Sequence, residues 1–216
     1  MSTKNTLIIS VILILIATLV GILIWNKLPE QVASHWNEND QVNGYMSRFW
    51  GVFLMPIVTT GMLALFLVIP SIDPLKANVA QFRETFNVFI AMIIAFMIYI
   101  HGLTLAWNLG YTNFRMGSAM LPALGLLFIF VGQLISKAKR NFFIGIRTPW
   151  TLSSDSVWDK THAISAKLFT ISGIAAFLGI LVPNYAIWLL MIPLLGTSLF
   201  SVVYSYFLYR AEQKAG

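Results

Sequence analysis

The sequence predicts an all-α integral membrane protein, a six-transmembrane-helix bundle with both termini cytoplasmic, one structured outer loop and one structured cytosolic loop. Composition supports this class, because 58% of the 216 residues are apolar and only 10% are charged, whereas soluble domains carry roughly 25% charged residues. Long uncharged runs predict the number of helices, and the distribution of lysine and arginine predicts their orientation.

The predicted spans follow from the uncharged runs. A helix needs about 20 residues to cross about 30 Å of hydrocarbon, and each long run between charged residues exceeds that length. The last run, residues 168–209, accommodates two spans joined by a tight turn at Pro183-Asn184. We therefore expect a single membrane domain over residues 1–216, with spans at residues 6–26, 50–70, 86–108, 116–136, 164–182 and 185–209.

Lysine and arginine are divided unequally between the two ends of these spans. Six spans place both termini on one side, and that side holds eleven of the fourteen basic residues, against three on the other. Because cytoplasmic loops are enriched in Lys and Arg, we expect the termini and a cytosolic elbow (residues 137–163) inside the cell. A loop at residues 27–49 then faces outside, in a multi-pass protein of the plasma membrane.

Composition also excludes several functions. The chain has no cysteine, which excludes disulfides, thiol catalysis and cysteine zinc sites. The net charge of +6 is explained by orientation in the membrane rather than by nucleic acid. The basic run Lys137-Ala138-Lys139-Arg140 is expected to meet anionic membrane lipids at the inner surface. We expect no cofactor, no bound metal and no direct contact with nucleic acid.

The elbow is the longest charged interruption of the apolar sequence. Pro149 has no N–H and pushes Thr148 toward an extended conformation, so an irregular segment is expected here. The run Ser156–Asp159 fits a capping box, in which the serine oxygen accepts a hydrogen bond from the amide three residues later and the Asp159 carboxylate accepts one from the Ser156 amide. The predicted helix then places four side chains on one face, namely Trp158, His162, Ser165 and Phe169.

Arg147 and Asp159 have two interpretations that remain open together. The two side chains can pair and pin the elbow. Alternatively, the planar guanidinium of Arg147 offers a fork of donors to a partner carboxylate, and neighbouring tryptophans act as anchors for that partner.

The run IGIRTPWTL followed by VWDKTH resembles the signature of the SdpI family, bacterial membrane proteins that give immunity to the sporulation-delaying-protein toxin. The resemblance covers Asn141 to Lys167. It implies protection against a secreted toxin peptide and toxin-dependent capture of a small helix-turn-helix repressor at the inner face. The partner-binding residues in that case are Arg147, Thr148, Pro149, Trp150, Trp158, Asp159 and His162.

The outer loop carries a second, weaker resemblance to the same family. Leu-Pro, a histidine followed by an aromatic residue and an Asn-Gly-Tyr turn all occur, but Ser34 and Asp40 stand where the family more often has proline and glycine. We expect a folded loop in which Trp36 and Tyr45 lie at the membrane interface; metal binding by His35 is a weak alternative. The candidate residues are Pro29, His35, Trp36, Asn43 and Gly44.

A small transporter or channel is the alternative function. Its candidates are His101 and Gln133, since ionisable or polar groups at membrane depth often line a pathway. Otherwise His101 is a neutral imidazole bonded to a neighbouring helix that Gly102 allows to approach. An enzyme is not expected, because no nucleophile–base pair or metal motif occurs at membrane depth; Asp155, Asp159 and His162 only imitate such a cluster.

Overall fold

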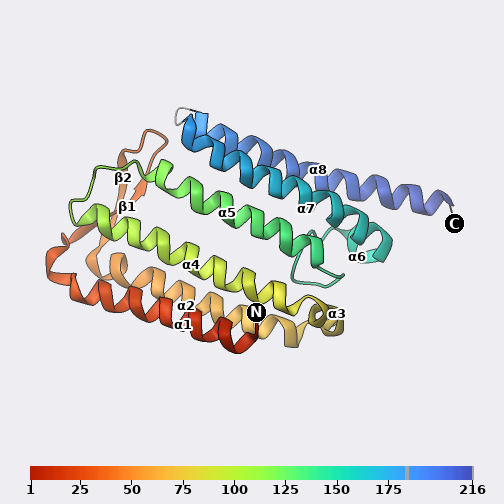
Figure 1. Cartoon of the computed structure of the whole chain (residues 1–216), viewed down its shortest axis with the longest axis horizontal. Coiled ribbons are helices and arrows are strands. Elements are labelled where there is room, and N and C mark those ends of the chain that lie inside the picture. The colour runs from red at the N-terminus through yellow and green to blue at the C-terminus, as the bar shows by residue number, and fades with distance from the viewer. Residues whose placement is uncertain (183–184, 216) are drawn as a thin grey trace.

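Six long helices form an elongated bundle in the computed structural model, which describes residues 1–182 and 185–215 (Figure 1). Each is long and apolar enough to cross a membrane, so the predicted number of spans is confirmed. The six helices are α1 (Thr3–Leu23), α2 (Arg48–Ile72), α4 (Arg83–Asn108), α5 (Met116–Lys137), α7 (Asp155–Leu178) and α8 (Ala186–Ala215).

The connections are more structured than the sequence indicated. After α1 come a 3-10 turn η1 (Trp25–Lys27) and an antiparallel hairpin of β1 (Gln31–Trp36) and β2 (Val42–Ser47). Two short helices were not expected, α3 (Lys76–Gln81) and α6 (Pro149–Ser153). A second 3-10 turn, η2 (Gly179–Leu181), follows α7. The predicted turn at Pro183-Asn184 lies outside the described residues.

The fifth long helix begins before the predicted span. Helix α7 begins at Asp155 and continues through residue 164, where the predicted span starts, so it includes most of the charged end of the elbow. Its N-cap is Ser154, whose hydroxyl accepts the Val157 amide, and not Ser156 as predicted. The serines around this start all have good capping chemistry, and local sequence did not distinguish between them.

The helices pack as two groups. Helices α1, α2 and α4 contact one another, α5, α7 and α8 contact one another, and α4 joins the groups through α5. Helices α5 and α7 approach very closely because glycines face each other: a Cβ on Gly125 would lie 2.7 Å from the Gly173 carbonyl oxygen, and one on Gly132 would lie 2.7 Å from the Ala166 carbonyl oxygen. Small residues permit such contacts between membrane helices.

A row of buried hydroxyls joins α7 and the elbow to α8. Ser165 Oγ lies 2.7 Å from Ser201 Oγ, and Ser172 Oγ lies 3.3 Å from Thr197 Oγ1. Because lipid offers no competing partner for a hydroxyl, these bonds help to select α8 as the neighbour of α7.

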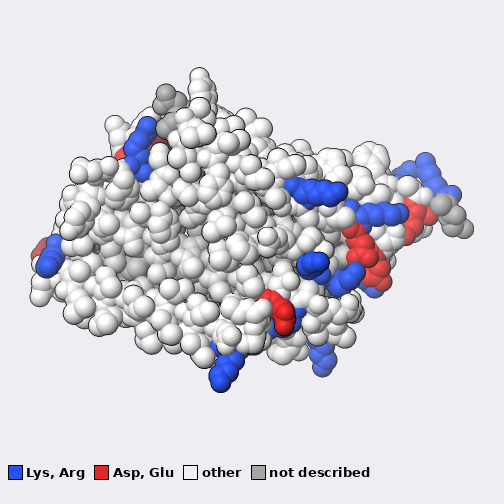
Figure 2. Space-filling view, viewed as in Figure 1, with Lys and Arg blue, Asp and Glu red and all other residues white. Residues whose placement is uncertain are grey.

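The two ends of the bundle differ in charge. Both termini lie at the same end as α3 and α6, which we call the elbow end, and the β-hairpin lies at the opposite, hairpin end (Figure 1). Most of the Lys, Arg, Asp and Glu side chains in view gather at the elbow end (Figure 2). The three basic residues assigned to the outside, Lys27, Arg48 and Arg115, lie at or next to the hairpin end.

The membrane orientation is checked by single cysteines, since the native chain contains none. Asn39 in the hairpin turn and Ser156 at the start of α7 are both exposed. We expect an impermeant maleimide added to intact cells to label Asn39→Cys and to leave Ser156→Cys unlabelled until the cells are permeabilised. Labelling of both positions in intact cells would contradict the proposed orientation.

Candidate functional site

The elbow is built around a buried pair of side chains on α7. The rings of Trp158 and His162 stack with centroids 4.0 Å apart, and Trp158 Nε1 donates to the Ala138 carbonyl oxygen at 2.8 Å. The chain passes over this pair at Gly145, whose φ is +110°. A Cβ on Gly145 would meet His162 Nε2 at 2.5 Å, so glycine is required both by its conformation and by the space available.

Both ring nitrogens of His162 are bonded. The Ile146 N–H donates to Nε2 at 3.0 Å, so Nε2 is the acceptor. Nδ1 therefore carries the hydrogen and donates it to the Trp158 carbonyl oxygen at 2.8 Å. This tautomer is assigned from the network of bonds. In it the imidazole is neutral and ties the strand after Gly145 to the first turns of α7.

The capping box of the elbow is at Thr148, not at Ser156. Thr148 is extended, as the following proline predicted, and its Oγ1 accepts the Thr151 amide while Thr151 Oγ1 accepts the Thr148 amide. Thr148 Oγ1 also lies 3.0 Å from Ser205 Oγ on α8. Short helix α6 is thereby fixed against α8, with Trp150 packed edge-on against Tyr206 at 5.1 Å.

Three polar side chains, which the sequence analysis did not select, hold the beginning of the elbow. Asn141 is fully buried; its Oδ1 accepts the amides of Phe143 and Ile144. Asp73, at the end of α2, is 2% exposed and accepts the Phe142 amide at 2.9 Å. Asn78 of α3 donates to the Arg140 carbonyl oxygen at 2.8 Å. The elbow is therefore attached to both groups of helices.

The proposed pairing of Arg147 with Asp159 is not observed. Asp159 lies 3.5 Å from Lys139 Nζ, and Arg147 donates to the Phe142 carbonyl oxygen at 2.7 Å. The closer ion pair of the elbow joins Arg140 to Asp155 at 2.7 Å. Spacing along the chain could not identify these partners, because the chain folds back between residues 140 and 155.

Burial divides the seven predicted partner-binding residues into two sets. Thr148, Trp158 and His162 are 7%, 0% and 2% exposed, so in this structure they shape the elbow and do not form its surface. The remaining four, exposed or half-buried, form what we call the elbow surface: Arg147, Pro149, Trp150 and Asp159.

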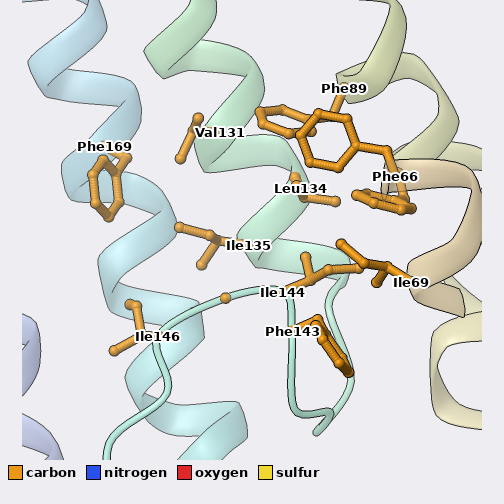
Figure 3. A pocket seen from close by; sticks show the side chains of 12 residues that line it. Phe66, Ile69, Phe89, Val131, Leu134, Ile135, Phe143, Ile144, Ile146 and Phe169 are labelled. Carbon is orange, nitrogen blue, oxygen red and sulfur yellow. The ribbon is translucent and has the colours of Figure 1, made fainter. Parts of the chain in front are cut away.

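An apolar cavity of about 320 Å³ lies under the elbow (Figure 3). The chain at Ile144 and Ile146 forms one wall, Leu134 and Ile135 of α5 form another, and Phe169 of α7 closes one side. The elbow strand thus has incomplete packing beneath it and depends on the hydrogen bonds described above.

At the hairpin end, the loop is folded as predicted, but its turn is elsewhere. Asn43 and Gly44 lie inside β2, and the turn is formed by residues 37–41, where the Asn37 amide donates to the Gln41 carbonyl oxygen. Gly44 pairs with His35, and a Cβ there would lie 2.8 Å from the His35 Cβ. His35 Nδ1 bonds with Asn43 Oδ1. In the described part of the chain, no group of three His, Asp or Glu converges.

Two contacts dock the hairpin on α4. One is between Trp36 and Trp107, and the other, which was not anticipated, is between Ala33 and Asn108. Trp36 packs edge-on against Trp107 at 5.7 Å, whereas Tyr45 is 63% exposed. Asn108, the last residue of α4, accepts the Ala33 amide at 2.7 Å and donates to the Ala33 carbonyl oxygen at 3.0 Å. Pro29 contributes its carbonyl oxygen, which accepts from Arg48 Nε.

Two family models match parts of the chain that include the elbow and the hairpin. The SdpI/YfhL protein family matches residues 137–205, and a Domain of unknown function (DUF1648) matches residues 12–60. Among known proteins, Immunity protein SdpI of Bacillus subtilis (strain 168) is 27% identical over 205 residues, which are 94% of this chain and 95% of that protein. The resemblance to the SdpI family is confirmed. No solved structure matches the chain.

The SdpI match contains the elbow, α7 and most of α8, and the second match contains the hairpin with parts of α1 and α2. The chain is a multi-pass bacterial membrane protein, as its hydropathy predicted. Asp40 has a φ of +59°, a conformation that glycine adopts freely and aspartate tolerates.

The polar residues within the membrane do not form a common path. His101 is 3% exposed on the face of α4 that carries Ile94 and Leu105, whereas Gln133 is exposed on the outside of α5. The predicted hydrogen bond to a neighbouring helix is absent for His101 Nε2 among the described residues. A Cβ on Gly102 would meet nothing within 4 Å, so the predicted close approach of a neighbouring helix at Gly102 is also wrong.

His101 can be tested by exchange for an apolar residue. A buried polar atom without a partner costs about 1–3 kcal/mol, so His101→Leu should keep or raise the melting temperature in detergent. His101→Gln, which retains polarity, is the matched control. A lower melting temperature for His101→Leu than for His101→Gln would show that the imidazole does have a hydrogen-bonding partner.

Proposed function

We propose that this SdpI-like protein is a non-enzymatic immunity protein that protects a bacterial cell from a secreted antimicrobial toxin peptide. The observation that carries the proposal is the near full-length similarity to Immunity protein SdpI, with the elbow and the hairpin both inside matched regions. The unequal distribution of basic residues supports placing the elbow end inside the cell and the hairpin end outside.

The geometry of the elbow argues against catalysis there. Asp155 and Asp159 each form an ion pair, and both nitrogens of His162 are bonded to the backbone. These bonds give all three side chains a structural role in the elbow. Recognition suits the elbow better than chemistry, because its buried residues fix a shape and its exposed residues present charged and aromatic groups.

We further propose that the elbow surface binds a small helix-turn-helix repressor when toxin is present, as the SdpI resemblance implies. Arg147 and Asp159 offer one charge of each sign, and Trp150 adds an aromatic face. Aromatic and arginine side chains are the commonest dominant contacts of protein interfaces.

Protection is tested by expressing the chain in cells sensitive to the sporulation-delaying-protein toxin. We expect cells with the native chain to survive toxin doses that kill cells carrying an empty vector. Equal killing of both strains, with the chain present in the membrane at normal amounts, would overturn the proposal.

The elbow surface is tested by two conservative variants. Arg147→Lys keeps the charge but loses the planar fork of donors, and Asp159→Asn keeps the shape but loses the charge. We expect both to lose signalling or immunity while expression and membrane insertion stay near normal, measured by a repressor-controlled reporter and by survival. Arg210→Lys, an exposed arginine of α8, is the matched control and should remain active. Full activity of both elbow variants would show that the elbow surface contacts no partner.

A further inference from the structure

A second, larger cavity of about 640 Å³ opens at the hairpin end. The turn of the hairpin forms one wall, and the first turns of α5 and α8 form the other. Its volume falls in the range of about 300–1,000 Å³ that is typical of small-ligand pockets. The cavity is therefore large enough for two or three side chains and too small for a folded domain.

The hairpin wall is polar and carries one free negative charge. Asp40 is held in place, because its carboxylate accepts from Arg115 Nε at 3.0 Å and from the Gly117 amide at 2.8 Å. Glu38 is exposed and forms no ion pair within the described part of the chain. Trp36, which lines the same cavity, has an indole Nε1 without a hydrogen-bond partner there. Arg115 and Asp40 neutralise each other in their ion pair. Glu38 therefore supplies the net negative charge that the cavity offers to a ligand.

The helix wall is apolar. Leu121 of α5 and Leu190 of α8 are 4% and 6% exposed, and Leu124 lies beside them. Ile187, 51% exposed, lies at the edge where α8 begins. A ligand here meets an apolar surface on one side and a carboxylate on the other.

We propose that this cavity binds an amphipathic segment of the toxin peptide, with an apolar side chain against Leu121, Leu124 and Leu190 and a cationic group beside Glu38. This inference rests on the proposed function, which it extends by naming the place and chemistry of toxin binding. A peptide suits the site better than a lipid chain, because a lipid chain would leave the polar hairpin wall without hydrogen-bonding partners.

Binding is measured directly with a single cysteine. Ser118 lines the cavity on α5, and Thr112 lies exposed in the preceding loop outside it. In intact cells expressing Ser118→Cys, we expect added sporulation-delaying-protein toxin to slow labelling by an impermeant maleimide. The same toxin should leave the labelling rate of Thr112→Cys unchanged.

Matched variants connect binding to survival. Ser118→Trp fills the cavity and Glu38→Lys reverses its free charge. For each we expect the toxin dose that kills half the cells to fall at least about tenfold, the change that losing about 1.4 kcal/mol of binding free energy produces. Thr112→Trp and Glu30→Lys make the same changes outside the cavity and should protect like the native chain.

The outcomes separate this inference from the proposed function. If the native chain protects cells but toxin does not slow labelling of Ser118→Cys, and the cavity variants protect normally, the cavity binds something other than toxin and the inference is overturned. If the native chain gives no protection at all, the proposed function fails first.

Discussion

Replacing Gly173 with leucine should prevent α5 and α7 from packing and should cause a large loss of stability. A Cβ at Gly173 would lie 2.5 Å from the Gly125 carbonyl oxygen and 2.9 Å from the Ile129 amide nitrogen. Both are backbone atoms, which cannot rotate away as a side chain does. Overpacking costs typically about 1–3 kcal/mol and occasionally more, and here the whole helix must move.

The measurement is the melting temperature of the detergent-solubilised protein, together with the amount inserted in the membrane. Gly196→Leu on α8 is the matched control, because a Cβ there meets nothing within 4 Å. Leucine favours helix more than glycine does, so this control should be as stable as the native chain. Equal melting temperatures for the two variants would show that α5 and α7 do not meet at Gly173.

Truncation of Trp158 to alanine should also be strongly destabilising, and it should disable the elbow. Trp158 is 0% exposed, donates to the Ala138 carbonyl oxygen and stacks on His162. Burying an alanine in place of such a large side chain costs about 3–5 kcal/mol. The loss should therefore lower the melting temperature and remove immunity together.

Two variants make this prediction specific. Trp188→Ala on α8 removes a tryptophan that is 60% exposed and should have little effect on stability. Trp158→Phe keeps an aromatic ring but leaves the Ala138 carbonyl oxygen without its donor, which costs about 1–3 kcal/mol. If Trp158→Phe and Trp188→Ala behave like the native chain, Trp158 is a membrane-interface anchor rather than the centre of the elbow.

Sequence reasoning succeeded at the elbow where one residue type dictates a conformation. Pro149 predicted that Thr148 is extended, and helical spacing predicted that Trp158, His162 and Ser165 share one helix face, which the structure shows to be buried. It failed where several residues had equal chemistry: Ser154 caps α7 although Ser156 was chosen. The tertiary contacts decided which was used.

The roles of charged and polar residues were the least predictable part of the candidate site. Arg147 was matched with Asp159 because both lie in one loop, yet Asp159 pairs with Lys139. Asp73 and Asn78, which anchor the elbow, come from the connection between α2 and α4, for which no contact with the elbow was predicted. Such partners depend on which distant segments meet, and one sequence does not contain that information in a local form.

The sequence by itself determined that this is a membrane protein with six spans, and it predicted which end carries most of the charge. Hydropathy and charge are sums over neighbouring residues, so they can be evaluated without knowing the fold. Only the tertiary structure decided which face of each helix lies inside. In lipid a helix is apolar all round, as the exposed Leu15 and Leu199 show. Inward faces are then selected by small residues and buried hydroxyls such as Gly173 and Ser165, whose partners lie far away in the chain.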